Sequence, residues 1–121
     1  TKTYKLRVLV GEEVKNRAPE FVYQEIDRVK VVGKDIVATI YTPIGLPEGL
    51  TAAKVREIEL WGQALPLYYA GEWNKFILAL ENLIKTFGEN KLYDLYLDRA
   101  KAFKKSPPPS NWQGVHVFNE K

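Results

Sequence analysis

The hydrophobic pattern of the chain changes its period at a segment rich in proline and glycine, residues 43–50, which we interpret as a linker or a long turn. Before this segment apolar and polar residues alternate, as in half-buried strands. After it apolar residues recur every three or four positions, as in amphipathic helices. Strands and helices kept in separate stretches predict an α+β fold. We expect a small antiparallel β-hairpin or meander, then a three-helix bundle, then an extended C-terminal tail.

The N-terminal part reads as strands around one short helical turn. Residues 4–10 alternate in polarity and predict a strand, and the acidic turn that begins at Gly11 must end before Pro19, because a residue before proline avoids helical geometry. Residues 21–32 predict a second strand. Its alternation slips at Ile26 and Asp27, which indicates a β-bulge there.

A third strand, residues 36–41, follows the second after the pair Gly33-Lys34. A Gly-X pair between two strands is typical of a tight antiparallel hairpin, because glycine takes the positive φ angle that such a turn needs. The hairpin would hold the Lys34 ammonium at its tip. Most exposed Gly-Lys turns carry no function, so spacing alone favours a plain surface turn.

Three helices are predicted after residue 50. Pro66 lies inside the first and should kink it, while glycines at positions 71 and 88 end the first and second. The second helix has the clearest pattern. Its predicted apolar face consists of Trp73, Phe76, Ile77, Leu80, Leu83, Ile84 and Phe87.

A proline run ends the third helix and begins the tail, in which residues 115–117 suggest a short strand. We therefore divide the chain into three predicted segments: residues 1–45 with the strands, 46–106 with the helices, and 107–121 as the tail. The chain does not begin with methionine, and we expect it to be part of a longer protein.

Composition excludes several kinds of chemistry. There is no cysteine, so a disulfide, a thiolate metal site and a cysteine nucleophile are all excluded. The single histidine, His116, has no nucleophile at a recognisable spacing and reads as a surface or edge-strand residue. A net charge of +3 argues against nucleic acid as a partner. No apolar run reaches the roughly 18 residues that span a bilayer, so we expect no direct membrane contact.

The segment 21–41 contains Phe21, then Glu-Ile-Asp-Arg-Val at 25–29, Val-Gly-Lys at 32–34 and Ile-Tyr at 40–41. It resembles the last hairpin of class III adenylate/guanylate cyclase catalytic domains. In that family an aromatic residue precedes Glu-Leu-Asp-Arg-Val, then Val-Lys-Gly-Lys, then Ile-Tyr-Glu. Residues 6–14 look like the strand and helix start that precede this hairpin. The helices and the tail, with its proline run, Trp112 and final Glu-Lys, resemble the C-terminal extension of bacterial members.

The helices are also similar to tetratricopeptide repeats. Phe76 stands where that pattern places a small residue, and Gly88 replaces its usual proline. The positions that match are Ala64, Leu67, Gly71, Trp73 and Leu80.

The cyclase resemblance implies conversion of ATP to cyclic AMP and pyrophosphate with Mg²⁺ or Mn²⁺. The metal-binding aspartates and the Asn/Arg pair would precede Thr1, so the chain alone is expected to be inactive and to hold no cofactor. Lys34 matches the lysine that contacts the triphosphate, although Val32 stands where the family usually has another lysine. The expected partners are the rest of the catalytic domain and ATP, and a homodimer is left open. The expected location is the cytoplasm, or the cytoplasmic side of a membrane that anchors the longer protein.

The alternative is a stand-alone helical interaction module of the tetratricopeptide kind, without catalytic activity. A cyclase needs about 130 further residues upstream that carry its metal site, in keeping with the usual size of one domain. An interaction module needs none.

Overall fold

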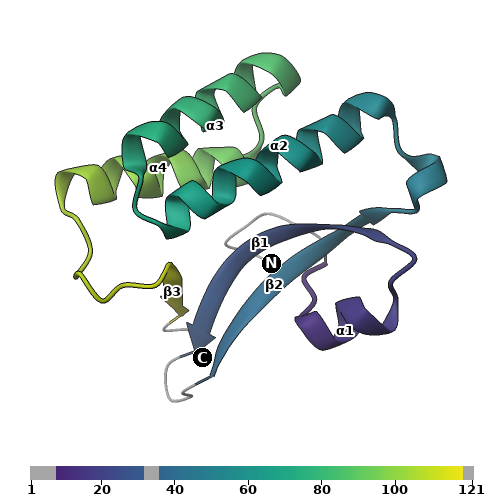
Figure 1. The fold of residues 1–121 in the computed structure, drawn as a ribbon, viewed down its shortest axis with the longest axis horizontal. Coiled ribbons are helices and arrows are strands. Elements are labelled where there is room, and N and C mark those ends of the chain that lie inside the picture. Colours follow the sequence, from purple (N-terminus) through teal and green to yellow (C-terminus); the bar gives the residue numbers. More distant parts are fainter. Residues whose placement is uncertain (1–7, 32–35, 119–121) are drawn as a thin grey trace. The chain divides into compact units, whose positions relative to one another are not determined.

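The structure is a computed structural model that describes residues 8–31 and 36–118. It is an α+β fold, which confirms the predicted class. Contacts divide the described residues into two compact units, one formed by residues 8–31, 36–52 and 115–118, the other by Ala53–Gly114. The division at residues 45 and 106 stays a prediction. Along the chain the elements are α1 (Glu12–Arg17), β1 (Val22–Val31), β2 (Val37–Gly45), the 3-10 turn η1 (Pro47–Gly49), α2 (Ala52–Tyr69), α3 (Trp73–Phe87), α4 (Lys91–Lys105) and β3 (Val115–Phe118) (Figure 1).

Strands β1 and β2 pair antiparallel, in a register that runs from Val22 opposite Gly45 to Lys30 opposite Val37. The register shifts between Glu25 and Asp27, where the slip in alternation predicted a bulge. Ile26, at this shift, is fully buried. The predicted strand after the hairpin was too short, because β2 continues to Gly45.

The prediction that a linker begins at Pro43 is therefore wrong. Pro43 lies within β2, opposite Tyr23, and a second register shift falls between Val22 and Tyr23. Proline has no N–H to give to the ladder, but a strand tolerates it beside such an irregularity. The break in the chain comes later, at η1.

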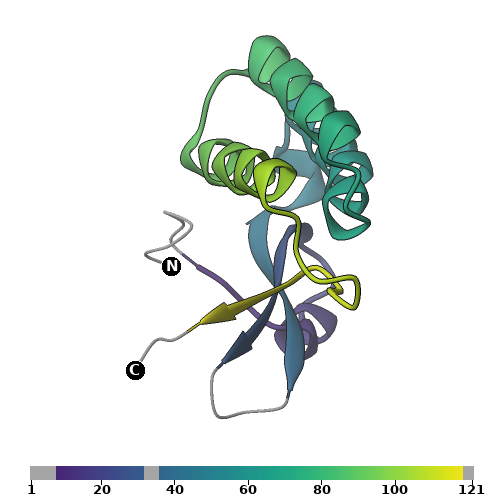
Figure 2. The same cartoon turned by 90° about the vertical axis from the view of Figure 1, so that its left-hand side faces the viewer.

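The sheet has three strands in the order β2-β1-β3, and β3 runs parallel to β1. Val115 lies opposite Arg28 and Phe118 opposite Val31. Figure 2 shows the arrows of β1 and β3 pointing in similar directions. The tail thus contains the short strand expected at residues 115–117. The sheet is mixed, which differs from the predicted antiparallel hairpin or meander, because a strand that returns after a long connection can pair in either direction.

Helix α1 and Val10 border the sheet next to β2. The backbone of Val10 makes two hydrogen bonds of 2.8 Å with Tyr41, one donated by each residue. Residues 1–7 lie outside the described part of the chain, so the rest of the strand predicted at 4–10 is untested. The α1 turn has the expected acids in its first turn, and its Arg17 pairs with Glu13 at 2.8 Å.

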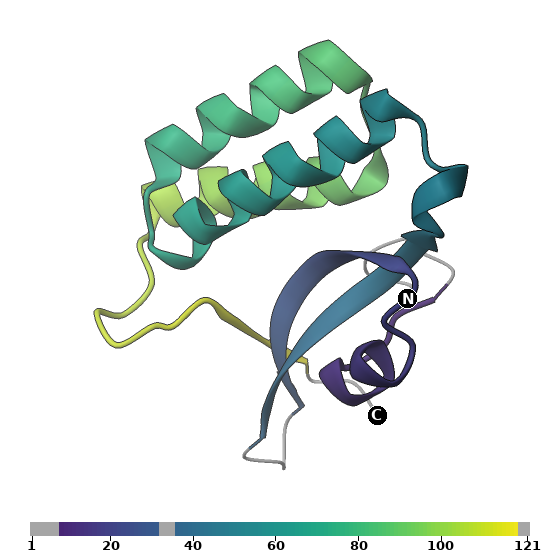
Figure 3. The same ribbon diagram turned by 45° about the vertical axis from the view of Figure 1, so that its right-hand side comes forward.

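Helices α2, α3 and α4 form the second unit, and successive helices run in opposite directions (Figures 1 and 3). The predicted bounds of α3 are confirmed, and Gly88 follows it with φ of 100°. Asn90 caps α4 by accepting a 2.8 Å hydrogen bond from the N–H of Tyr93. The core of this unit consists of Trp61, Ala64, Leu65, Tyr68, Phe76, Leu80, Leu83, Leu92, Tyr93, Tyr96 and Ala100.

Tyr68 is the centre of an aromatic cluster in that core. Its ring centre lies 4.8 Å from that of Tyr96, 5.3 Å from Phe76 and 5.5 Å from Trp112. The contacts with Tyr96 and Trp112 are edge-to-face, and such contacts add to the burial of the rings themselves. The segment after α4 is thereby fastened to the helices, since Trp112 contacts a core residue.

Candidate functional site

Lys34, the site residue predicted from the sequence, lies outside the described residues, as does Gly33. The structure describes the strands on either side. Lys30 and Val37 are the paired residues nearest to the connection that contains Lys34. Ile36, just before β2, and Val37, its first residue, are 71% and 52% exposed, so both apolar side chains are in contact with solvent. The position of the Lys34 ammonium stays a prediction.

His116 lies in β3, opposite Val29, in the last strand of the sheet order. This is the edge-strand location that the sequence favoured. Among residues 8–31 and 36–118, no three side chains of the metal-binding kinds lie close enough together to hold a metal ion. Within the same ranges, no helix is long and apolar enough to cross a membrane.

The first unit has a cation–aromatic cluster where α1 meets β1 and β2. The Lys15 ammonium lies 5.1 Å from the ring centre of Tyr41 and 5.8 Å from that of Tyr23. The Tyr23 hydroxyl donates a 2.8 Å hydrogen bond to the carbonyl of Ala18, which fixes this ring. Beside the cluster is a hollow of about 300 Å³, whose lining consists of Lys15, Asn16, Pro19, Phe21 and Tyr23.

The electrostatics of this cluster suit a cation. Burial raises the pKa of Tyr41, and the carboxylates of Glu25 and Glu12 raise it further. The same carboxylates and the faces of the two rings attract an ammonium, which Lys15 supplies. The chain itself therefore provides the charge that this cluster favours, and the arrangement holds α1 against the strands.

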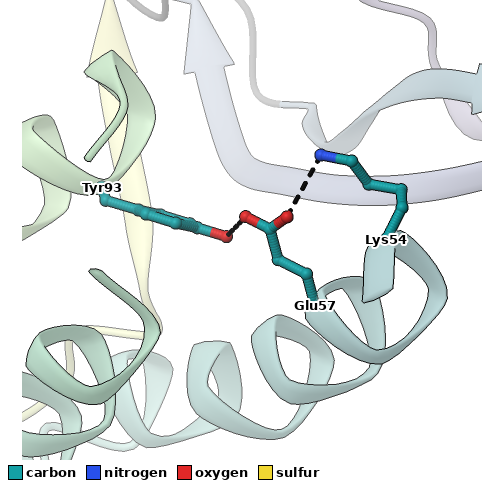
Figure 4. A network of polar contacts seen from close by, with 3 residues as sticks. All are labelled: Lys54, Glu57 and Tyr93. Atoms are coloured by element: carbon teal, nitrogen blue, oxygen red, sulfur yellow. Dashed lines mark hydrogen bonds and ion pairs between the residues drawn. The ribbon is translucent and has the colours of Figure 1, made fainter. Parts of the chain in front are cut away.

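The second unit contains a polar network that joins α2 to α4 (Figure 4). The Tyr93 hydroxyl donates a 2.6 Å hydrogen bond to Oε2 of Glu57, and Lys54 Nζ lies 3.1 Å from Oε1. Tyr93 is fully buried, and the Glu57 side chain is only 12% exposed. Burial raises the pKa of Tyr93 well above its ordinary value of 10.0, and the Glu57 carboxylate adds to the effect.

This network is suited to structure rather than to proton transfer. A tyrosine whose pKa is raised this far keeps its proton at neutral pH and serves as a hydrogen-bond donor. Sequence reasoning missed the pair because its members are 36 residues apart. Helical spacing places Glu57 and Tyr93 on their helices but does not say which residues of two helices meet.

The outer face of α3 carries a hollow of about 610 Å³, larger than the one beside Lys15. Leu78 lies in it and is 69% exposed. The apolar face predicted from the sequence did not include Leu78. The signal was present, since Leu78 follows Lys75 by three residues and precedes Asn82 by four, and such residues share one side of a helix. The hollow is lined by Lys75, Leu78, Ala79, Glu81, Asn82 and Lys85.

Comparisons with family models, with curated proteins and with solved structures found no match to this chain.

Proposed function

We propose that this chain is the C-terminal part of a class III nucleotidyl cyclase, which converts ATP to cyclic AMP and pyrophosphate. The observation that carries the proposal is the pairing of β1 with β2 and its register shift at Asp27. Both strands overlap the segment that resembles the last hairpin of that family, and the shift falls within the Glu-Ile-Asp-Arg motif. This supports an interpretation of residues 21–41 as one strand pair with Lys34 between its strands.

In this proposal Lys34 binds the triphosphate. A lysine ammonium acts on phosphate as a compact positive charge, and it would stabilise the negative charge that develops on the departing pyrophosphate. The carboxylates that hold Mg²⁺ or Mn²⁺ would come from the preceding part of the catalytic domain. The longer protein would work in the cytoplasm, and this chain would have a structural or regulatory role in it.

The helical unit would be the extension that follows the catalytic domain, similar to tetratricopeptide repeats. Ala64 and Leu80 are buried, as small and large core positions of such a repeat would be. Phe76, which departs from the pattern, is also fully buried, with its ring centre 5.3 Å from that of Tyr68. A large ring at this position replaces the close helix approach that a small residue would allow.

The second candidate function is a stand-alone interaction module without catalytic activity. One observation favours it: residues Ala53–Gly114 form a compact unit of helices.

The two functions are separated by an assay of the longer protein. Purified protein is incubated with ATP and Mg²⁺ or Mn²⁺, and cyclic AMP and pyrophosphate are measured together. The cyclase proposal predicts equal amounts of both products from the longer protein and none from the present chain alone. Turnover by the present chain, or a longer protein that yields neither product, would reject it.

A further inference from the structure

The outer side of α3 carries opposite charges on either side of an exposed leucine. We call this surface the α3 stripe, and it consists of Lys75, Leu78, Ala79, Glu81, Asn82 and Lys85. Leu78 is 69% exposed, the second-highest exposure among the exposed large hydrophobic residues of the described chain. Within the described residues, none of the three charged side chains of the stripe makes an ion pair. The charges are therefore available to a partner.

We propose that the α3 stripe binds the α3 stripe of a second copy of this chain, antiparallel, about a two-fold axis at Leu78. In such a pair each residue faces the one equally far on the other side of Leu78. Lys75, three residues before, then faces Glu81 of the other copy, three residues after. The same ion pair forms twice, and the two Leu78 side chains meet at the centre.

The order of charges along α3 favours this arrangement over other pairings of the two helices. A parallel pair would place Lys75 opposite Lys75 of the other copy. An antiparallel pair centred two residues later would place Lys75 opposite Lys85. Both alternatives bring like charges together, which disfavours them. The Leu78-centred pair also places Asn74 opposite Asn82, and two amides can hydrogen-bond to each other.

The surface predicts a weak, reversible dimer. One leucine from each copy and two exposed ion pairs fall short of the apolar area that a permanent interface buries. Leu78 stands on an open face of α3, so the leucine of a second copy can reach it. This inference does not depend on the cyclase proposal, because it uses only residues of α3.

Sedimentation equilibrium of the full chain, from about 10 µM to about 1 mM, tests the proposal in the concentration range of weak association. K75E and E81K alone should each weaken dimerisation about tenfold, because each replaces two ion pairs with two repulsions. An equimolar mixture of the two variants should associate more tightly than either variant alone. In the mixed pair, positions 75 and 81 are acidic in one copy and basic in the other, so both ion pairs form again. The double variant K75E/E81K should regain the affinity of the original chain.

The control is K101E, which changes the net charge as K75E does but lies on α4, where Lys101 is exposed. It should leave the dimer unchanged. Circular dichroism checks that every variant keeps its helices. A chain that is monomeric at about 1 mM overturns the proposal. So does a dimer that K75E and K101E weaken equally, or a mixture of K75E and E81K that associates no better than its components.

Discussion

The hydroxyl of Tyr93 donates a 2.6 Å hydrogen bond to the carboxylate of Glu57, and this bond ties α4 to α2 inside the helical unit. Tyr93 has no exposed surface, so its polar atom depends on this partner. Lys54 holds the other carboxylate oxygen.

Tyr93→Phe should lower the free energy of unfolding by about 1–2 kcal/mol, because it removes one hydrogen bond to a charged group while the ring stays buried. Urea denaturation of the full chain measures the change. Glu59→Gln is the control, because Glu59 lies on the same helix as Glu57. Glu59 pairs with Arg56 at 3.4 Å, both side chains are more than half exposed, and its loss should cost less than about 0.5 kcal/mol. Equal costs at the two sites would contradict the structural role of the network.

The same pair predicts a loss of stability in alkali. The pKa of Tyr93 is higher in the folded chain than its ordinary value of 10.0, which we take for the unfolded chain. The folded state therefore holds the proton of the Tyr93 hydroxyl more tightly than the unfolded state does. The contribution of Tyr93 to the free energy of unfolding is complete below pH 10 and declines as the pH rises above 10. Between about pH 10 and about pH 11.5 the original chain should lose up to about 1.4 kcal/mol per pH unit more than Tyr93→Phe does.

The comparison with Tyr93→Phe isolates this one group, because every other titratable side chain is the same in both proteins. Unfolding in urea at several pH values provides the measurement. Parallel stability curves for the two proteins would show that Tyr93 titrates normally and would contradict the assigned environment.

Gly114 should tolerate alanine poorly. Its φ angle is +85°, and an added Cβ would lie 2.5 Å from Cδ1 of Tyr69. Gly71 is the matched control, with φ of +78° but its nearest atom, on the Trp73 ring, at 3.8 Å. Gly71→Ala should cost about 1–2 kcal/mol for the backbone alone. Gly114→Ala should cost about 1–3 kcal/mol more, because the ring must also move.

Thermal or urea unfolding of both variants measures the difference. The extra cost should shrink when Tyr69→Ala is combined with Gly114→Ala, since the clash is then removed. Similar losses of stability for the two glycine variants would mean that the Tyr69 ring moves aside at no cost, and they would contradict the prediction.

The two faces of α3 predict opposite sensitivities to truncation. Phe76 is fully buried, and Phe76→Ala should cost about 3–5 kcal/mol by opening a cavity. Leu78 is exposed, and Leu78→Ala should change the free energy of unfolding of the monomer by less than about 0.5 kcal/mol. Phe76→Leu provides a milder variant that still folds. Urea denaturation at low protein concentration checks both. A large loss of stability in Leu78→Ala would mean that Leu78 is buried, and it would contradict the assignment of the two faces of α3.

Features set by neighbouring residues were predictable from the sequence. The period of α3, its end at Gly88 and the register shift at Asp27 all follow from local patterns. Features set by distant residues were not predictable. The parallel pairing of Val115 with Arg28 depends on where a long connection returns, and the bond of Tyr93 to Glu57 depends on how two helices meet.

Pro43 misled the sequence reasoning for a related reason. A proline usually ends a strand, but a register shift in the partner strand accommodates this one. The role proposed for Lys34 does not follow from local pattern, because in the cyclase proposal it depends on residues outside this chain that would hold ATP and metal.

The most direct test of the cyclase account is the rate of cyclic AMP formation by the longer protein with Lys34→Ala, compared with Lys30→Ala. Both changes remove one lysine from the same part of the chain, and Lys30 lies within β1. If Lys34 binds the triphosphate, its loss should lower kcat/KM for ATP about 10- to 100-fold, as expected when a charge-assisted phosphate contact is removed. Lys30→Ala should leave kcat/KM nearly unchanged. An unchanged kcat/KM for Lys34→Ala, or an equal loss in both variants, would contradict the account.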